Sequence, residues 1–484
     1  MSTIRSQRLA ISSHSVARLL GEWERDGPGY VDLADKLRAL VMDGRIARGA
    51  WLPSERELAT ALGKSRTMVI AAYRRLRELG YVTSVRGAGS LIKLPDDASL
   101  PASSKRIDDA IDLSRAAPQM WRAIPDVIRE AAEVFSSDPG EPFDLVGRPA
   151  LRQSIAEYYS ERGLATRPTQ IMVTLGAQHA ITLLARTLLG RGDRILVETP
   201  SYPHAIHALR SEGGRIDALT AVPLDQAGWD LTRFDNALQA ARPSLAYLIP
   251  DLHNPTGMSM TAETREHVTG QAARFGTILI ADETTAELAH SQDSPSPLPL
   301  ACYSRDERLV VTVGSLSKSV WGGMRIGWIR AHESMIDQLA LTRQHVDLGT
   351  PAFEQSVAVR VLARLPEALA DRRRELSQAR DLVERFIHSR LPGWEIESPP
   401  GSVSMWVSLG VPLSSELAEA GRGIGLTLTP GSSFGVDGGF ESHLRIPITE
   451  PITVLERALE LLDDAWSASI RRPPIAKRRV PSFV

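Results

Sequence analysis

Lys318 is the residue whose surroundings most clearly suggest chemistry, because it follows small side chains in Ser315-Leu316-Ser317-Lys318. The apolar run 309–313 before it predicts a buried strand, and ligands of α/β sheets gather at the carboxyl ends of strands. A lysine amine in such a place can form a Schiff base with a carbonyl compound. Ser315 and Ser317 are candidates to bind a phosphate, and Arg325 offers a cation to the same phosphate. Exposure to solvent is the alternative for a lone lysine in a serine-rich loop.

Two more polar residues follow apolar runs that predict strands. Asp282 comes directly after the run 277–281, and because burying an acid alone is costly, it needs a partner such as a pyridinium nitrogen. Asn254 opens the tetrapeptide NPTG after the run 246–249, and its side chain can donate to a phenolate oxygen. For this tetrapeptide alone, an ordinary turn is an equally good interpretation.

A third candidate is the start of a predicted helix at Gly176-Ala177-Gln178. Small residues at a helix start leave backbone amides and the positive end of the helix dipole available to a phosphate. Many helices begin in this way, so the feature has weight only together with the others.

The order of these features resembles the fold-type-I aminotransferases that depend on pyridoxal 5'-phosphate (PLP), across roughly residues 110–465. Asp282 follows Asn254 by 28 positions, and Lys318 follows Asp282 by 36. The resemblance implies that Lys318 holds PLP as a Schiff base, that Asp282 pairs with the ring nitrogen, and that Asn254 donates to the ring O3'. It also implies that Tyr202 stacks on the ring and that Arg445 binds the carboxylate of an amino compound.

The sequence departs from this family at two positions. Where the family commonly has a tyrosine, three residues after the acid, this chain has Thr285, which remains a cofactor-binding candidate with a shorter hydroxyl. Five residues before Gly147, where a family tyrosine commonly reaches the phosphate of the partner subunit, it has Pro142. These changes put efficient catalysis in doubt more than cofactor binding.

The first part of the chain predicts a different domain. Helical spacing over 31–45 places Leu33, Leu37, Leu40 and Val41 on one face. A capping box of Ser54 and Glu57 begins a second helix that ends at Gly63, and Ser65 caps a third that ends at 79–80. Two β-prone runs, 81–85 and 91–94, flank a glycine-containing loop and predict a hairpin. Three helices followed by a hairpin describe a winged helix-turn-helix.

In a winged helix-turn-helix the third helix enters the major groove of DNA. Arg66 is best placed for a bidentate contact with guanine, and the neighbouring residues contact bases or phosphates. The string LPSERELATALGKSRTMVIAAYRRLRELGYV resembles the GntR-type winged helix over roughly residues 30–95. A small helical domain with a solvated basic face is the alternative. The candidate DNA-binding residues are Ser54, Arg56, Lys64, Ser65, Arg66, Thr67, Arg86, Gly87 and Gly89.

Composition agrees with two parts that meet different partners. Residues 1–95 contain 16 Lys+Arg against 9 Asp+Glu, a net charge of +7, so the rest of the chain holds 40 against 49, a net charge of −9. The basic part suits a polyanion. The sequence has no apolar run of about 18 residues and no evident secretory signal, which argues against a membrane span. The single cysteine, Cys302, fits a reducing cytoplasm and suggests no metal site.

The whole chain resembles the MocR subfamily of GntR-type transcriptional regulators. The expected fold is α/β, with a winged helix-turn-helix at 15–95, a linker at 96–110, an aminotransferase-like domain at 111–468 and a basic tail at 469–484. This aminotransferase-like domain should hold a large mixed sheet between helices and a smaller C-terminal α+β subdomain. The resemblance implies operator DNA, PLP and an amino-compound effector as partners, in a head-to-tail, domain-swapped homodimer.

Three function classes remain open. The first is a PLP-dependent regulator that senses an amino compound or PLP itself. The second is an active aminotransferase with an accessory DNA-binding domain. The third is a regulator whose large domain holds no PLP, and the complete set of lysine, acid and arginine argues against it.

Overall fold

The computed structural model describes residues 10–21, 23, 28–42, 45–46, 49–85, 89–93, 110–137, 139–141, 143–213, 219–225, 228–291, 297–436 and 439–471. The chain forms two compact units. The first unit contains Met1–Asp112, Val411–His443 and Leu461–Val484, and the second contains Leu113–Gly410 and Leu444–Glu460. The predicted tail from residue 472 onward and all but the last residue of the predicted linker lie outside the described residues.

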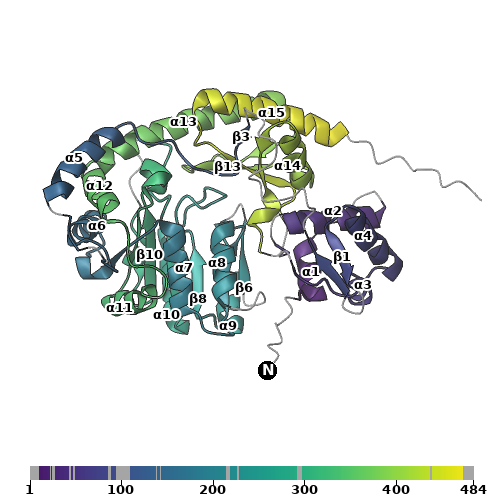
Figure 1. Cartoon of the computed structure of the whole chain (residues 1–484), viewed down its shortest axis with the longest axis horizontal. Helices are drawn as coiled ribbons and strands as arrows, with labels where there is room; N and C mark the ends of the chain where they lie inside the picture. The colour runs from purple at the N-terminus through teal and green to yellow at the C-terminus, as the bar shows by residue number, and fades with distance from the viewer. Residues whose placement is uncertain are drawn as a thin grey trace, which may run out of the picture. The chain divides into compact units, whose positions relative to one another are not determined.

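The N-terminal part of the first unit is a helical bundle with a β-hairpin, drawn in purple and blue in Figure 1. Its elements are α1 (Ser13–Leu20), α2 (Gly29–Met42), α3 (Glu55–Leu62), α4 (Arg66–Glu78), β1 (Val82–Val85) and β2 (Gly89–Ile92). The antiparallel pairing of β1 with β2 forms the predicted wing. The prediction of a winged helix-turn-helix is therefore confirmed, while helix α1 is an addition that the sequence patterns did not reveal.

Local capping explains where these helices begin and end. The Ser54 side chain accepts from the backbone N–H of Glu57 (3.3 Å), and a Glu57 carboxylate oxygen accepts from the Ser54 N–H (2.9 Å). Helix α3 stops at Gly63, whose φ of 64° lies in the left-handed region that favours glycine. The Ser65 hydroxyl accepts from the Met68 N–H and starts α4. The capping box and both helix boundaries were predicted from sequence.

One apolar core holds these helices together. It includes the four residues that share the predicted face of the first helix, all of them buried: Leu33, Leu37, Leu40 and Val41. Tyr73 of α4 is also buried, and its hydroxyl donates to the Pro53 carbonyl oxygen (2.9 Å). This bond ties α4 to the turn that precedes α3.

The first unit also includes the short strand β3 (Ile111–Asp112) and elements from the C-terminal part of the chain. The C-terminal elements are α14 (Ser414–Gly423), β14 (Leu426–Thr427), β15 (Thr429–Pro430) and the 3-10 turn η6 (Gly431–Phe434). Strand β3 pairs in parallel with β14.

The second unit is built on an eight-stranded sheet with the strand order β4-β11-β10-β9-β8-β5-β6-β7. Pairing is parallel from β10 through β9, β8 and β5 to β6, and antiparallel between β11 and both of its neighbours. The strands are β4 (Ile171–Thr174), β5 (Ile195–Thr199), β6 (Leu219–Asp225), β7 (Gly228–Trp229), β8 (Leu245–Leu248), β9 (Ile278–Asp282), β10 (Val310–Ser315) and β11 (Gly327–Arg330). The sheet is mixed, as predicted, and the carboxyl ends of its parallel strands share one edge.

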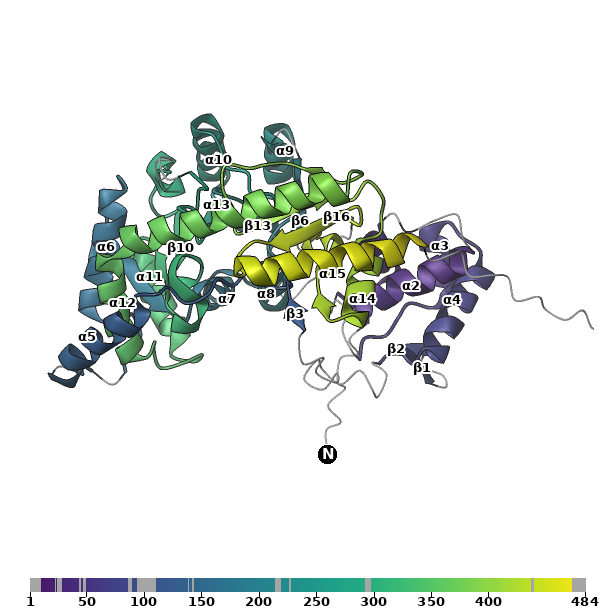
Figure 2. The same cartoon turned by 90° about the horizontal axis from the view of Figure 1, so that it is seen from above.

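Helices cover both faces of this sheet. Helix α7 packs on β4, β10 and β11, whereas α9 packs on β6 and α10 on β9. Figure 2 shows α7 and α8 on one side of the sheet and α9 and α10 on the other. The helices of this unit are α5 (Ile124–Ser137), α6 (Pro149–Glu161), α7 (Ala177–Leu188), α8 (Pro203–Gly213), α9 (Leu231–Ala241), α10 (Ala262–Phe275), α11 (Glu333–Arg343), α12 (Ala352–Ala363) and α13 (Leu365–Arg390).

A smaller sheet follows, in which β12 (Glu395–Ile396), β13 (Ser404–Ser408) and β16 (His443–Pro447) are neighbours in that order. Helix α15 (Ile452–Arg471) ends the described chain. Together with α14, these elements match the predicted α+β character of the C-terminal part. In the ranges that the structure describes, no helix is long and apolar enough to cross a membrane.

Candidate functional site

Lys318 lies where the sequence predicted, just after β10, in a π-helical turn over Ser317–Trp321. Its Nζ donates to the carbonyl oxygen of Ala116 (2.5 Å). Burial, and after it the charge of Arg445, lowers the pKa of Lys318 to about 8, while Asp282 opposes both. The amine is therefore available as a nucleophile at a much lower pH than an ordinary lysine.

Asp282 ends strand β9 and is buried, as predicted. The hydroxyl of Tyr247, on the neighbouring strand β8, donates to its Oδ2 at 2.6 Å. The backbone N–H of Thr284 donates to Oδ1 (3.1 Å). Burial and the nearby Asp282 carboxylate raise the pKa of Tyr247 well above its usual value, so the phenol stays protonated and donates. Tyr247 holds the carboxylate in place.

Sequence reasoning missed Tyr247. The signal was a single tyrosine in an otherwise aliphatic strand, Leu245–Leu248. The strand register explains why Tyr247 reaches Asp282. Tyr247 pairs with Ile280 in the parallel sheet, and Asp282 lies two residues further along on the same face.

Asn254 lies in the loop after β8, and its side-chain Oδ1 is buried without a hydrogen-bond partner. Such an atom is costly unless a ligand completes it. The preceding residue, His253, stabilises the loop: Nδ1 lies 3.0 Å from the Thr256 hydroxyl, and Nε2 lies 3.3 Å from the Glu198 carboxylate. Glu198 in turn accepts from the Trp229 indole N–H (2.6 Å). No sequence pattern indicated this buried support for Asn254.

The predicted phosphate residues come together around the N-terminus of α7. Gly176 precedes the helix with a φ of 83°, and a Cβ there would lie 3.2 Å from two nitrogens of Arg325. Arg325 also donates to the carbonyl oxygen of Leu175 (2.5 Å). The first amides of α7, starting at Ala177, thus lie beside a guanidinium, which suits a phosphate.

The other phosphate candidates have local roles as well. The Ser315 hydroxyl donates to the Ile326 carbonyl oxygen (3.1 Å) and accepts from the Ser317 N–H (3.1 Å). The Gln178 side-chain amide donates to the carbonyl oxygen of His204 (3.2 Å). These bonds shape the turn that carries Lys318 and join the start of α7 to the start of α8, which follows Tyr202 directly.

Tyr202 and Arg445 complete the group around Lys318. Burial, and after it the charge of Asp282, raises the pKa of Tyr202 to about 12, while Arg445 and Arg325 oppose the rise. Arg445, in strand β16, is buried and donates to the carbonyl oxygen of Ser114 (2.5 Å). Tyr202 therefore lies within electrostatic reach of Asp282 and Arg445, and Lys318 lies within reach of the same two residues.

Thr285 is buried, but its hydroxyl bonds to backbone: it is 3.1 Å from the Asp251 carbonyl oxygen and 3.2 Å from that of Leu252. It supports the loop that carries Asn254. Pro142, the other departure from the family pattern, lies outside the described residues.

The candidate DNA-binding residues form an exposed row in the first unit. Lys64, Ser65, Arg66 and Thr67 at the start of α4 are all exposed, as are Arg56 and Gly89. Arg86 and Gly87, in the predicted wing loop, lie outside the described residues. The exposure of consecutive residues at the N-terminus of α4 is what base contact requires.

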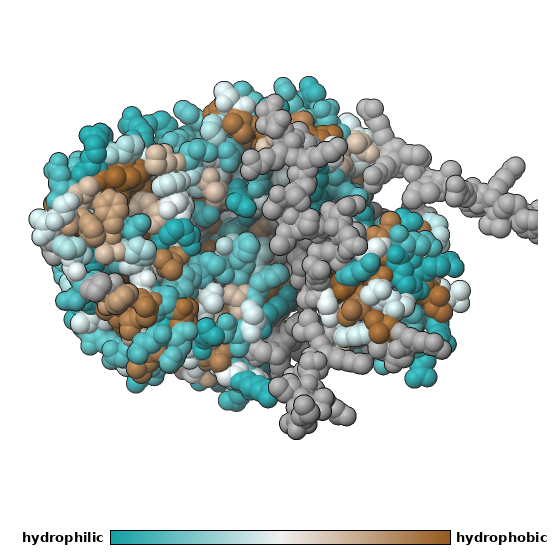
Figure 3. All heavy atoms as spheres, in the orientation of Figure 1, coloured by the Kyte–Doolittle hydropathy of each residue, from teal (hydrophilic) through white to brown (hydrophobic). Residues whose placement is uncertain are grey.

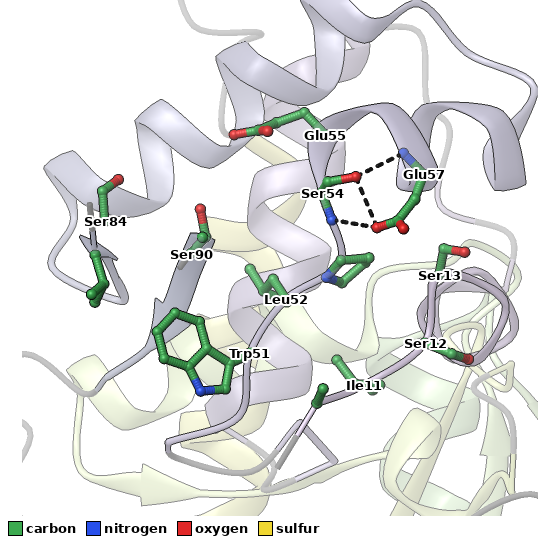
Figure 4. A pocket seen from close by; sticks show the side chains of 14 residues that line it. Ile11, Ser12, Ser13, Trp51, Leu52, Ser54, Glu55, Glu57, Ser84 and Ser90 are labelled. Carbon is green, nitrogen blue, oxygen red and sulfur yellow. Dashed lines mark hydrogen bonds between the residues drawn. The ribbon is translucent and has the colours of Figure 1, made fainter. Parts of the chain in front are cut away.

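A hollow of about 660 Å³ lies next to this surface, between the N-termini of α1 and α3 and the wing. Figure 4 shows Ser12 and Ser13, Trp51, Ser84 and Ser90 around it, and the paired bonds of Ser54 and Glu57 at its rim. None of the residues around Lys318 lines it.

A family model described as "Aminotransferase class I and II" matches residues 111–462, well over half of the chain. The chain belongs to this aminotransferase family. A second model, described as "Bacterial regulatory proteins, gntR family", matches residues 29–92, the helices α2 to α4 and the wing. The winged helix is therefore a GntR module, and the order of domains is that of GntR/MocR-type regulators.

Three individual proteins illustrate the similarity. The chain is 26% identical to the uncharacterized HTH-type transcriptional regulator YisV of Bacillus subtilis, over 80% of this chain and 86% of that protein. It is 28% identical to the probable rhizopine catabolism regulatory protein MocR of Rhizobium meliloti, over 65% of this chain and 67% of that one. The crystal structure of LysN, an α-aminoadipate aminotransferase from Thermus thermophilus complexed with N-(5'-phosphopyridoxyl)-L-leucine, matches with a TM-score of 0.67 and 24% identity, over 75% of this chain and 94% of LysN.

PLP is the cofactor of the aminotransferase-like domain. The residues of this chain fit it: a carboxylate held by Tyr247, a phosphate cradle at Gly176 and Arg325, and Asn254, whose side-chain amide can donate to the ring oxygen.

Proposed function

We propose that this chain binds operator DNA through its GntR module and senses an amino compound, or PLP itself, at Lys318. The observation that carries the proposal is the presence, in one chain, of a PLP-type site and an exposed row of DNA-contact residues. PLP, when bound, supplies an electrophilic carbon and a ring that withdraws electrons. The chain supplies the amine of Lys318, the carboxylate of Asp282 and the guanidinium of Arg445.

In this proposal each residue has a binding task. Asp282, held by Tyr247, receives the ring nitrogen, and the side-chain amide of Asn254 donates to the ring oxygen. Arg445 binds the carboxylate of the amino compound, for which a planar guanidinium is well suited. With PLP bound, Lys318 would hold the cofactor and the amine of that compound would compete with it, so the site would have two states that differ in their contacts with the chain.

At the DNA, Arg66 reads a base and Lys64 and Arg56 bind phosphates. We expect Arg66→Ala to weaken binding to a selected operator by about 1–3 kcal/mol, the scale of one bidentate base contact. Fluorescence anisotropy measures the loss, and Arg77→Ala, whose guanidinium bonds to Ser84, serves as the control. An unchanged affinity would remove Arg66 from base readout.

We further propose a homodimer, working in the bacterial cytoplasm, in which two chains lie head to tail and their two GntR modules read two half-sites. Apolar side chains on the second unit support a partner surface, since large exposed apolar areas mark interfaces. Figure 3 shows hydrophobic areas where α5 and α12 lie in Figure 1. The exposed large apolar residues of this region and of α11 and its following loop are, among the described residues, Ile128, Val134, Phe143, Leu341, Val346 and Leu348.

An active aminotransferase is the second candidate, because the set around Lys318 is complete and LysN, with the same fold, is an aminotransferase. Multiple-turnover transfer of an amino group from common amino donors to keto acids would favour it. The hydroxyl of Thr285 bonds to backbone, where the family commonly has a tyrosine, and this favours binding over turnover.

One experiment tests the proposal as a whole. An operator is selected from random DNA, and a panel of amines and PLP are screened for changes in cofactor absorbance and operator affinity. We expect Lys318→Ala to keep operator binding, to lose the absorbance of attached PLP and to lose the response to the amine. The proposal is contradicted if the wild type selects no operator from random DNA, or if Lys318→Ala keeps the absorbance of attached PLP.

A further inference from the structure

The GntR module shares one compact unit with the segment Val411–His443, and helix α2 of the module contacts this segment. The ammonium of Lys36, in α2, pairs with the carboxylate of Glu441. Both side chains are buried, with exposed fractions of 9% and 7%. A buried ion pair is stable only if further hydrogen bonds complete it.

Glu441 has those further bonds. Its Oε2 accepts from the Ser414 hydroxyl (3.0 Å) and the Ser415 N–H (3.1 Å), and its Oε1 accepts from the Ser415 hydroxyl (2.8 Å). Although burial raises the pKa of Glu441, Lys36 and the serine hydroxyls lower it more, so the net shift is downward. The carboxylate is ionised, and Lys36 and the first residues of α14 bond to both of its oxygens.

Two more cations of the module contact the same segment. The buried guanidinium of Arg45 donates to the carbonyl oxygens of Ser432 (2.6 Å) and Gly435 (2.8 Å). Arg38 makes a two-pronged contact with Glu419 (2.7 and 3.2 Å), but this pair is half-exposed. The basic module and the segment 414–441 are therefore complementary in charge.

The position of Glu441 in the chain gives this contact its significance. It precedes Arg445, the proposed carboxylate-binding residue, by four positions, and β16 begins between them at His443. Four residues span at most about 14 Å even when fully extended, so only a short stretch of backbone connects the two residues. A change at Arg445 has a short path along the backbone to Glu441.

We propose that the Lys36–Glu441 pair is the contact through which the occupancy of Arg445 changes how firmly the DNA-binding module is held. This inference rests on the proposed function of Arg445. A desolvated ion pair depends steeply on geometry, so a small displacement of Glu441 weakens it sharply. Regulation needs only such a difference in contact between two states.

The test uses the full-length protein and a stable probe, N-(5'-phosphopyridoxyl)-L-alanine, whose carboxylate addresses Arg445. Hydrogen–deuterium exchange is followed in peptides that cover α2, with and without the probe. Three variants are compared with the wild type: Lys36→Met with Glu441→Gln, which removes both charges; Arg38→Met with Glu419→Gln, the matched half-exposed control; and Lys36→Arg, which keeps the charge.

We expect the probe to change exchange in α2 of the wild type, the control and Lys36→Arg, and this change to be lost in Lys36→Met with Glu441→Gln. Probe binding itself, measured by titration, should be equal in all four proteins, because neither Lys36 nor Glu441 belongs to the cofactor site. Equal changes in α2 for all proteins that bind the probe would overturn the inference while leaving the proposed function intact. Failure of the wild type to bind the probe would overturn both.

Discussion

The environment of Lys318 allows a quantitative prediction about its amine. Burial and the guanidinium of Arg445 lower its pKa from the ordinary 10.5 to about 8, against the pull of Asp282. At 1.36 kcal/mol for each pKa unit, the difference of 2.5 corresponds to about 3.4 kcal/mol. At pH 7 roughly one-eleventh of such amines are unprotonated, about 300 times more than for a pKa of 10.5.

Competitive labelling measures this directly and does not require PLP. The PLP-free protein is treated with trace acetic anhydride at pH 6 to 11, and acetylation of the peptide that contains Lys318 is quantified by mass spectrometry. The exposed Lys64 provides an internal reference within the same chain. We expect the labelling of Lys318 to reach half of its maximum near pH 8.

Two variants establish the sign of the effect. Because Arg445 disfavours the charged amine, Arg445→Gln should move the midpoint to higher pH. Because Asp282 favours the charged amine, Asp282→Asn should move it to lower pH. A wild-type midpoint near 10.5, or shifts in the same direction for both variants, would refute the electrostatic account of the site.

Three further predictions concern stability, measured by chemical denaturation. Lys318→Met should stabilise the PLP-free protein below pH 8, by up to about 3.4 kcal/mol. Because the unfolded wild-type chain binds more protons than the folded one between the two pKa values, the stability gained by the variant should shrink from pH 8 to 10.5. A gain in stability that grows with pH would contradict the sign of the pKa shift. Tyr247→Phe should cost about 1.5–3 kcal/mol, the scale of a hydrogen bond to a charged group, and should also weaken PLP binding; a neutral result would mean that Tyr247 does not support Asp282. Lys36→Met should cost about 3–5 kcal/mol because it leaves the Glu441 charge buried and unpaired, whereas Arg38→Met should cost about 0–1 kcal/mol; equal losses would show that burial does not distinguish the two pairs.

The features that the sequence predicted well are those that depend on near neighbours. The bonds between Ser54 and Glu57 and between Ser65 and Met68 join residues three positions apart, so residue types alone indicate them. The strand ends at Asp282 and Ser315 follow from apolar runs that stop at a polar residue. The resemblance to a known family then added Tyr202 and Arg445, which no local pattern marks.

The features that the sequence did not predict depend on which elements become neighbours. Tyr247 reaches Asp282, 35 positions away, only because β8 lies beside β9. Glu198 supports His253 because β5 lies beside β8. The pair of Lys36 and Glu441, 405 positions apart, requires the GntR module to share a unit with the C-terminal segment. Hydrophobic periodicity does not determine strand order or the docking of one domain on another.

The role of Thr285 indicates what this site is suited to do. A residue that moves protons during catalysis needs a hydroxyl that faces the reacting groups. The Thr285 hydroxyl instead bonds to two carbonyl oxygens, of Asp251 and Leu252, in the loop that carries Asn254. It therefore supports that loop. Binding a ligand at Lys318 requires a stable loop around Asn254, whereas repeated turnover requires groups that move protons. The position of the Thr285 hydroxyl therefore favours a sensor over an enzyme.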